Sequence, residues 1–279
     1  MMEHKLGNRL LAGLPPAEFD LLAPHFRKVP LERGTILVRS GDRVEQIYFP
    51  RSGAISFMQD MPDGQTVATA MIGNEGAVGI LLALGPTRSP ITAVVHIPGT
   101  ALQISPTRFF STFSHSPALR HAVQMHTVAL LAQFQRVAAC NALHSVEARM
   151  ARWLLHIHDR AHVEQLPLTQ EELSELIGVR RPTVTQAVCK LRKSGAIRSN
   201  QRGLIEIDRP HLEATACKCY GVMRREIDRI LSPETMKPRI YTPAPKSARS
   251  PEQLPNAVNH EKGRHSRPHG TSSQRPRGH

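Results

Sequence analysis

The chain contains 279 residues, with 36 lysines and arginines against 23 aspartates and glutamates, and its formal net charge is +13 at pH 7. This length favours two domains of ordinary size over a single one, and the basic balance indicates an anionic partner, nucleic acid or a membrane surface. The sequence shows no apolar run long enough to span a membrane and no signal-peptide pattern at its start, so we expect a cytoplasmic protein with no membrane partner.

The N-terminal half changes texture after its first helical turns. Residues 6–28 form an amphipathic start that prolines interrupt, which predicts short helices. From Val29 to about Ile104, short runs of alternating apolar residues stand between evenly spaced turn signals, one of them Pro62-Asp63-Gly64. This pattern predicts an antiparallel β-roll of jelly-roll type.

A long helix follows the β-roll. Ser116 is a suitable N-cap and Pro117 suits the first helical position, so the helix should run to about Asn141. A seam with alternating spacings of four and three residues runs along it: Leu119, Val123, His126, Leu130, Gln133, Val137 and Cys140. Such a heptad-like seam predicts that the helix pairs with its own copy in a dimer, with His126 packed in the interface.

The next segment has the signals of a helix-turn-helix. Ser145 can cap a helix that starts after a hinge near His144. Thr169 and Glu172 then form a capping box for a first short helix, and Gly178 can end that helix. Pro182 suits the first turn of a second helix, which should end at Gly195.

The charge of this segment predicts that the helical hairpin binds DNA. No acidic residue stands between Glu175 and Glu206, and seven basic residues do: Arg180, Arg181, Lys190, Arg192, Lys193, Arg198 and Arg202. Two short β-like runs after Gly195 predict a wing with Arg202 at its tip, and Leu212–Leu231 reads as one final amphipathic helix. Residues 232–279 contain eight prolines and little apolar content, which predicts a disordered basic tail.

The whole arrangement resembles the Crp/Fnr family of bacterial transcription regulators over roughly residues 10–231. The match lies in the order of Gly34-Thr35-Ile36-Leu37, Ser40-Gly41-Asp42, Tyr48-Phe49 and Gly53, then the long helix, the stretch HSVEARMARWLL and the basic helix-turn-helix. The resemblance implies an α+β protein with an effector domain in residues 1–115, a dimerisation helix in 116–143 and a winged helix-turn-helix in 144–231; the tail predicted from composition, 232–279, follows these three parts. It further implies a homodimer on palindromic double-stranded DNA and contact with RNA polymerase.

The recognition helix departs from the best-known family readers. Those members use an Arg-Glu-x-x-x-Arg pattern; here Arg181 matches, but Pro182 replaces the glutamate and Gln186 the second arginine. Proline cannot accept from a cytosine amine and glutamine favours adenine, so the half-site does not carry over. We predict base contacts by Arg181, Thr183, Thr185 and Gln186, and phosphate contacts by Arg180, Lys190, Arg192 and Arg202.

The effector region departs further. Family members that bind cyclic nucleotides carry a Gly-Glu turn for the ribose and, about ten residues on, an Arg-Ser or Arg-Thr pair for the phosphate. Here Gly79, Arg88 and Ser89 are the candidate effector-binding residues, but Ile80 stands where the glutamate would be. Without that carboxylate the sequence disfavours a tight cyclic-nucleotide site, and it favours Arg88 as a surface arginine in a turn.

Cysteine and histidine positions predict no cofactor and no metal site. No cysteine precedes Cys140, which excludes the N-terminal iron–sulfur cluster of the oxygen-sensing branch of the family. Cys217 and Cys219, two residues apart on the predicted final helix, should point to different faces as semi-buried thiols. The histidines at 156, 158 and 162 are interpreted as solvent-facing.

The function predicted from these features is a sequence-specific DNA-binding transcription regulator, under the control of an effector that the sequence does not identify. The alternatives are a cyclic-nucleotide-responsive or a thiol-redox-responsive sensor. An enzyme is not expected, because the sequence has no Gly-rich phosphate loop, nucleophile elbow or zinc-protease helix motif.

Overall fold

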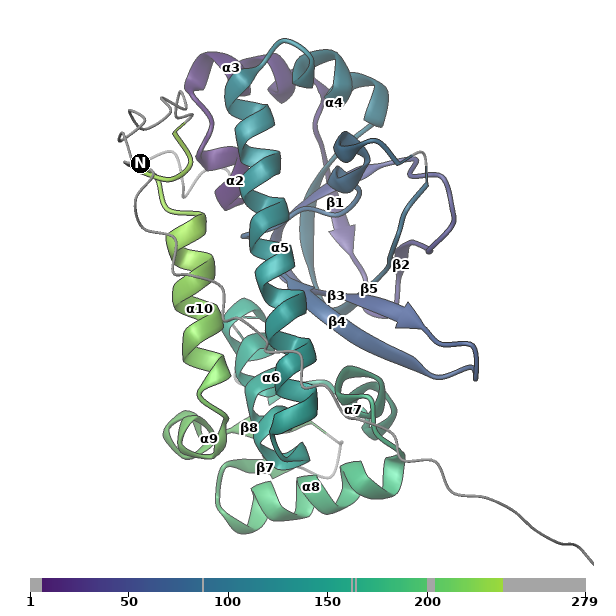
Figure 1. The fold of residues 1–279 in the computed structure, drawn as a ribbon, viewed down its shortest axis with the longest axis vertical. Helices are drawn as coiled ribbons and strands as arrows, with labels where there is room; N and C mark the ends of the chain where they lie inside the picture. The colour runs from purple at the N-terminus through teal and green to yellow at the C-terminus, as the bar shows by residue number, and fades with distance from the viewer. Residues whose placement is uncertain (1–6, 87, 162, 164, 200–203, 238–279) are drawn as a thin grey trace, which may run out of the picture. The chain divides into compact units, whose positions relative to one another are not determined.

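The computed structural model describes residues 7–86, 88–161, 163, 165–199 and 204–237. Within it, the predicted β-roll is an antiparallel sheet (Figure 1) of β1 (Arg27–Leu31), β2 (Ile36–Val38), β3 (Ile47–Asp60), β4 (Thr66–Ile72) and β5 (Thr92–Ile104). The strand order is β1-β5-β3-β4, with β2 also paired to β5. The predicted hairpin turn joins β3 to β4, and Gly64 adopts a left-handed φ of 81° that glycine tolerates best.

Short helices cover one end of this sheet, as the proline-interrupted start predicts. They are α2 (Arg9–Ala12), α3 (Pro16–Leu22), the 3₁₀ turns η1 (Ala23–His25) and η2 (Ile80–Leu84), and α4 (Pro106–Phe113). Their apolar side chains form one cluster with Phe49 of the sheet, Phe109 of α4 and the first turns of the long helix. This aliphatic and aromatic cluster also includes Ile227, Ile230 and Leu231 from the C-terminal part of the chain.

The long helix α5 spans Pro117–Leu143, and Ser116 caps it by accepting a hydrogen bond from the Leu119 amide at 2.9 Å. The predicted pairing of this helix through the Leu119–Cys140 seam is wrong, because that face is not available to a second copy. All seven seam residues, from Leu119 to Cys140, are buried within the single chain, because this face packs against the β-roll and the neighbouring helices. His126 is buried there, 2% exposed, rather than in an interface between two copies.

The second half follows the predicted winged helix-turn-helix. It comprises α6 (Val146–Ala161), β6 (Gln165–Leu166), α7 (Gln170–Ile177), α8 (Arg181–Lys193), β7 (Ile197–Ser199) and β8 (Ile205–Ile207). The three strands form an antiparallel sheet in the order β6-β8-β7. The apolar core of this half includes Trp153 and Leu154 of α6 and continues into Met58 and Met71 of the β-roll, so the two halves share buried surface.

The predicted single helix at Leu212–Leu231 is wrong. The structure has α9 (Arg209–Thr215) and α10 (Cys219–Ile230), because Ala216 is extended (ψ 147°) and the Cys217 amide bonds the Ala148 carbonyl at 3.4 Å instead of continuing the helix. After this break, α10 runs beside α5 (Figure 1) and packs against it. Residues 217–236 therefore lie along the long helix.

Packing continues past Leu231. The Met236 side chain is 3% exposed and lies in the cluster formed by the N-terminal helices, and the Thr235 carbonyl is 2.7 Å from Nε2 of His121. The rest of the predicted tail, from residue 238 on, lies outside the described residues. Among the helices in the described ranges, none combines the length and apolar character that crossing a membrane requires.

Candidate nucleic-acid interface and effector region

Local sequence signals position the helical hairpin α7–α8. Thr169 and Glu172 form the predicted capping box, and Gly178 ends α7 with a left-handed φ of 69°. Leu173 and Leu176 of α7 pack with Val184 and Leu191 of α8 in the core of this half. The buried stripe fixes which side of α8 faces inward, and the remaining side chains must face out.

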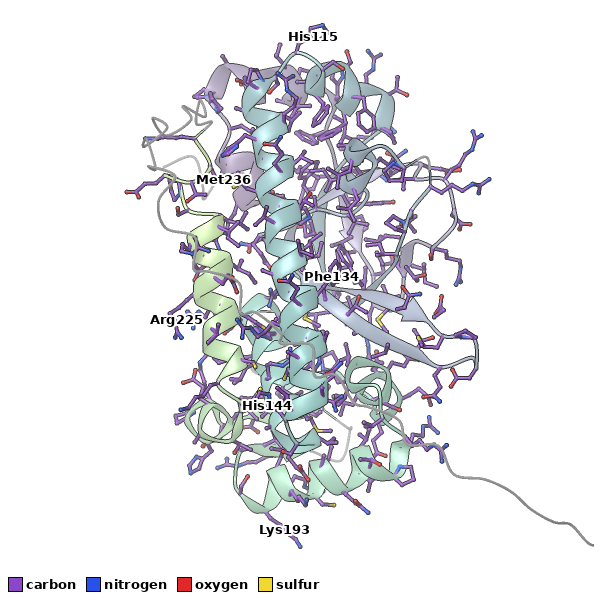
Figure 2. All side chains as sticks on the ribbon, in the orientation of Figure 1. His115, Phe134, His144, Lys193, Arg225 and Met236 are labelled. Atoms are coloured by element: carbon purple, nitrogen blue, oxygen red, sulfur yellow. The ribbon has the colours of Figure 1, made fainter. Side chains whose placement is uncertain are left out.

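The outward side of α8 carries the predicted DNA-contacting residues. Arg180, Arg181, Thr185, Gln186, Lys190 and Arg192 are exposed, and Thr183 is half-buried. Arg202 lies outside the described residues. Two further exposed cations border this surface, Lys193, whose side chain points away from the protein in Figure 2, and Arg198 of β7. Their charge was visible in the sequence, but no motif position marked them.

Carboxylates from neighbouring helices already hold two of these cations. Arg181 pairs with Glu171 of α7, and Lys190 pairs with Glu147 of α6, whose pKa is lowered chiefly by the hydrogen bond from that lysine. Both pairs lie at the surface, where an ion pair contributes only about 0–1 kcal/mol. Phosphate groups can therefore displace the carboxylates at small cost.

The β-roll also contacts the first helix of the hairpin. Arg33 donates to both carboxylate oxygens of Glu172, at 3.1 and 2.5 Å, and Nδ1 of His96 lies 4.0 Å from the same carboxylate. Burial would raise the Glu172 pKa, but hydrogen bonds from Arg33 and Thr169 lower it overall. A Cβ at Gly178 would lie 2.8 Å from Cγ2 of Val67 on β4, so the turn before α8 touches the sheet directly.

The three candidate effector residues are engaged by their own chain. A Cβ at Gly79 would lie 2.8 Å from Cγ1 of Val44 and 2.9 Å from the Gln46 carbonyl oxygen, so this backbone is tightly enclosed. Exposed Arg88 donates to the Gly41 carbonyl at 2.7 Å. The Ser89 hydroxyl donates to the Ile91 carbonyl at 2.7 Å and accepts from the Ile91 amide at 3.3 Å.

Apolar side chains pack close to Gly79. Ile80, at the position of the expected glutamate, is 1% exposed and belongs to the N-terminal core. Phe134, labelled on α5 in Figure 2, packs with Leu81 and Leu82 against the interior of the sheet. Ile80 thus offers a ribose no acceptor, in keeping with the sequence prediction against a tight cyclic-nucleotide site, which stays a prediction.

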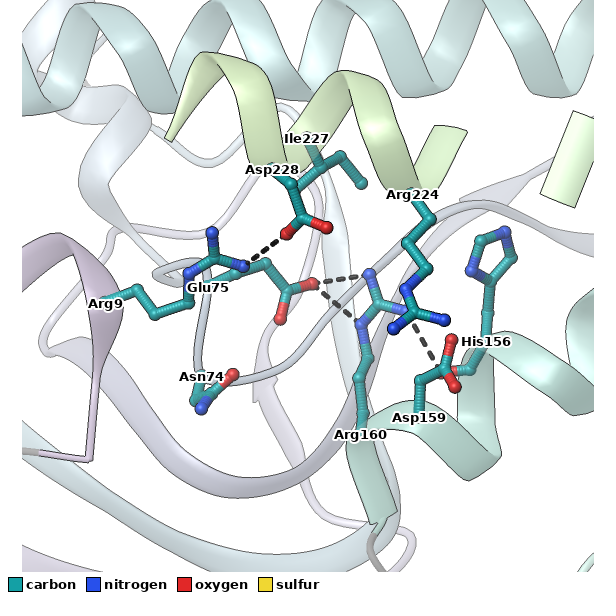
Figure 3. Close-up of a pocket in the computed structure, with 9 residues that line it drawn as sticks. All are labelled: Arg9, Asn74, Glu75, His156, Asp159, Arg160, Arg224, Ile227 and Asp228. Carbon is teal, nitrogen blue, oxygen red and sulfur yellow. Dashed lines mark hydrogen bonds and ion pairs between the residues drawn. The ribbon is translucent and has the colours of Figure 1, made fainter. Parts of the chain in front are cut away.

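A polar cavity of about 220 Å³, which the sequence did not indicate, lies where the two halves meet (Figure 3). Arg160 of α6 binds the Glu75 carboxylate through Nε at 2.7 Å and Nη2 at 2.5 Å, and both side chains are buried. Arg9 of α2 pairs with Asp228 of α10 at 2.9 Å. Ion pairs between segments distant in the sequence therefore close this junction.

Two protein-family models match the chain. The cyclic nucleotide-binding domain matches residues 28–116, and the Crp-like helix-turn-helix domain matches residues 148–215. The chain is 22% identical over 216 residues to a CRP-like cAMP-activated global transcriptional regulator of Mycobacterium tuberculosis, covering 74% of this chain and 96% of that protein. It is 23% identical over 205 residues to the cyclic AMP receptor protein of Thermus thermophilus, covering 72% and 93%.

Solved structures show the same fold. FixK2 from Bradyrhizobium japonicum superposes with a TM-score of 0.58 at 14% identity, over 69% of this chain and 98% of that one. A CRP/FNR-family transcriptional regulator from Thermus thermophilus gives a TM-score of 0.56 at 23% identity, over 68% and 98%. These likenesses confirm the predicted α+β arrangement of a β-roll, a long helix and a helix-turn-helix.

Proposed function

This chain belongs to the Crp/Fnr family of transcription regulators, and from that premise we propose that it binds a palindromic DNA site as a homodimer joined through α5. The observation that carries the proposal is the outward face of α8, where six of the predicted contact residues are exposed on one basic helix. A helix of this kind fits the major groove and reads base edges with its N-terminal residues.

We assign base contacts to the first turns of α8 and phosphate contacts to its flanks. Arg181, Thr183, Thr185 and Gln186 lie within the first six positions of the helix, where side chains reach base edges. Arg180, Lys190, Arg192 and Arg202 supply positive charge for phosphates. Because of Pro182 and Gln186, we expect the half-site to differ from the one that the best-known family members read.

A second, exposed heptad on α5 supports the homodimer. Spacings of four and three residues relate a set of exposed side chains: Gln124, Val128, Leu131, Gln135, Ala138 and Ala142. Val128 and Leu131 leave 46% and 54% of their surface in water. Burying such a stripe against the same stripe of a second copy stabilises a dimer. A two-fold dimer then presents two α8 helices to two half-sites.

We do not extend the cyclic-AMP response of the relatives to this chain, because Ile80 offers no acceptor and the Ser89 hydroxyl is already bonded to the Ile91 backbone. Contact with RNA polymerase and a cytoplasmic location follow from the family and from a chromosomal partner. They are part of the proposal.

Selection of bound sequences from random DNA by the full chain tests the function. A palindrome with two equal half-sites is the expected product. The absence of any enriched sequence would contradict sequence-specific binding, and a single unrepeated site would contradict the dimer.

The dimer face has its own test in a matched pair of leucines. Leu131 and Leu84 are each 54% exposed, but only Leu131 belongs to the exposed heptad of α5. Leu131→Glu should give a monomer by light scattering, because it places a like charge opposite itself in the partner, whereas Leu84→Glu should stay dimeric. Equal behaviour of the two variants would move the interface elsewhere.

A further inference from the structure

Four side chains able to bind a metal meet where α5 ends and α10 begins. Cys140 and His144 lie one turn apart at the end of α5, where Figure 2 labels His144, and Cys217 and Cys219 lie at the break before α10. Their four potential ligand atoms all lie within 4.8 Å of one another. The Cys140 and Cys217 sulfur atoms are 3.5 Å apart, and Sγ of Cys219 is 3.7 Å from Nδ1 of His144.

The earlier interpretation of Cys217 and Cys219 as thiols on different helix faces is wrong. They flank the start of α10 instead of sharing a continuous helix, and all three clustered cysteines are buried, at 0%, 8% and 8% exposure. The interruption between α9 and α10 at Ala216 places the sulfur atoms of Cys217 and Cys219 near Cys140.

These distances fit one tetrahedral ion. Zn–S bonds of about 2.3 Å and a Zn–N bond of about 2.0–2.1 Å hold ligand atoms about 3.5–3.8 Å apart, so the widest pair here needs to close by only about 1 Å. We propose that Cys140, His144, Cys217 and Cys219 form a structural zinc site. Three soft thiolates and one imidazole are a usual ligand set for zinc in a closed site.

Two buried arginines supply an independent argument from charge. Arg152 is 0% exposed, its Nε and Nη2 atoms have no hydrogen-bond partner among the described residues, and Nη1 has only the sulfur of Met223 at 3.9 Å. Arg149 is 8% exposed, and its Nε atom is likewise unpartnered within the described ranges. No ion pair joins either arginine to a carboxylate in the described part of the chain, and a buried unpaired charge is costly.

The zinc site provides the missing counter-charge. Arg152 interacts electrostatically with all three thiols, and Arg149 with Cys140 and Cys217. Three thiolates around a divalent ion leave a net charge of −1 next to these guanidinium groups, whereas three neutral thiols leave none. The arginines and the cluster therefore explain each other.

Two other uses of the cluster explain less of it. An iron–sulfur cluster spreads its ligands over two or more iron atoms and so needs them further apart than a single ion does. A Cys140–Cys217 disulfide would use two of the four side chains and would leave Cys219 and His144 without a role. The zinc site uses all four and joins α10 to α5 across 77 residues of sequence.

Metal analysis of the full chain tests the inference without DNA, so it stands or falls separately from the proposed function. Protein prepared under reducing conditions and dialysed against zinc should retain about one ion per chain. Replacement by cobalt(II) should give the intense visible bands of a tetrahedral site and a near-ultraviolet thiolate-to-cobalt band. Reduced wild-type protein that retains no zinc and shows no thiolate–cobalt band would overturn the proposal.

Variants assign the ligands. Cys217→Ser and Cys219→Ser should each lose most of the bound zinc, and His144→Ala should weaken zinc binding at least about tenfold while keeping the thiolate–cobalt band. Cys189→Ser is the matched control, because Cys189 is the exposed cysteine of α8 outside the cluster, and it should bind zinc like the wild type. Equal zinc content in Cys217→Ser and the wild type would refute the assignment. So would a disulfide between Cys140 and Cys217 that forms in metal-free protein and still forms when zinc is present. The wild-type cobalt spectrum decides the question even if a cysteine variant fails to fold.

Discussion

The predicted functional residues of the two halves differ in how accessible they are to a ligand. Six of the eight predicted contact residues are exposed on or beside α8. The carboxylates that pair with Arg181 and Lys190 keep 57% and 22% of their side-chain surface in water, so phosphate can replace them. In the β-roll, Arg88 and Ser89 already bond to the backbone beside them, and Ile80 is packed in the core. One half therefore leaves its predicted contact residues accessible, whereas the candidate groups of the other half are bonded or packed within the chain.

This difference indicates which functional property two proteins of the same fold are more apt to share. DNA binding needs only a rigid helix with outward cations, and the buried stripe of α8 guarantees that geometry. A cyclic-nucleotide site needs particular acceptors and donors on loops, and a single replacement such as Ile80 removes one of them. The predictions below test this contrast, beginning at the junction of the two halves.

The largest effect is expected from the buried pair at that junction. Arg160→Ala leaves the Glu75 carboxylate buried, and among the described residues the Gly73 amide is then its one hydrogen-bond donor, at 3.1 Å. Removing one member of a buried ion pair costs about 3–5 kcal/mol, and the remaining amide places this variant near the lower end. Urea unfolding should show a loss of about 3 kcal/mol in the free energy of unfolding.

Arg225→Ala is the matched control, because Arg225 lies exposed on α10 and points outward in Figure 2. It should change the free energy of unfolding by less than about 0.5 kcal/mol. If Arg160→Ala behaves like Arg225→Ala, this ion pair does not stabilise the junction, and the shared apolar core holds the two halves together without it.

The next effect concerns His126, buried between α5 and the β-roll. Burial lowers its pKa to about 4, against smaller opposing effects of a backbone hydrogen bond at Ala77 and of Glu75. The unfolded chain takes up this proton near pH 6.5 and the folded chain only near pH 4, so stability is present above the higher value and is lost as the pH falls towards the lower one. The full loss is about 3 kcal/mol, of which about 2 kcal/mol is reached at pH 5.

Unfolding of the wild type and of His126→Gln at about pH 7.5 and about pH 5 measures this contribution as a difference in pH dependence. The variant should lose about 2 kcal/mol less on acidification. His115→Gln, at an exposed loop position labelled in Figure 2, should keep the wild-type dependence. Unchanged pH dependence in His126→Gln would mean that His126 is not held neutral by the core.

On the DNA half, base contacts and phosphate contacts should separate. Gln186→Ala should cost about 1–3 kcal/mol on the selected site and relax the preference at one base position. Arg192→Ala should weaken all sequences alike and lower the dependence of binding on log salt by about one unit. A uniform loss from Gln186→Ala in competition binding would contradict the division of roles along α8. Arg202→Ala should resemble Arg192→Ala.

The sequence was sufficient where local signals decide structure. The capping box at Thr169, the left-handed Gly178 and the Ser116 cap were predicted and are present. It was insufficient where two patterns compete: α5 carries two heptads, and the more apolar one, through Leu119 and Leu130, packs against its own β-roll. Periodicity shows that a face is buried, but it does not show by what.

The cysteine cluster was missed for a related reason. Predicting one helix at Leu212–Leu231 put Cys217 and Cys219 on different faces, and the break at Ala216 removes that argument. At the break the Cys217 amide bonds the carbonyl of Ala148, a residue distant in the sequence, and such a contact leaves no local signal. Sites that join α5 to α10 therefore needed the tertiary structure.

The smallest expected effect is the sharpest test of the contrast between the halves. Arg88→Ala removes an exposed side chain with one hydrogen bond to the Gly41 carbonyl, so stability should change by less than about 1 kcal/mol. If Arg88 bound a cyclic phosphate, cyclic AMP or cyclic GMP would stabilise the wild type by RT ln(1 + [L]/Kd), and Arg88→Ala would abolish that gain. We expect no thermal shift with either nucleotide in the wild type, in Arg88→Ala or in the exposed control Arg108→Ala. A shift seen in the wild type and Arg108→Ala but lost in Arg88→Ala would show that the β-roll can release Arg88 for a ligand, and both halves would then present their functional groups in the same way.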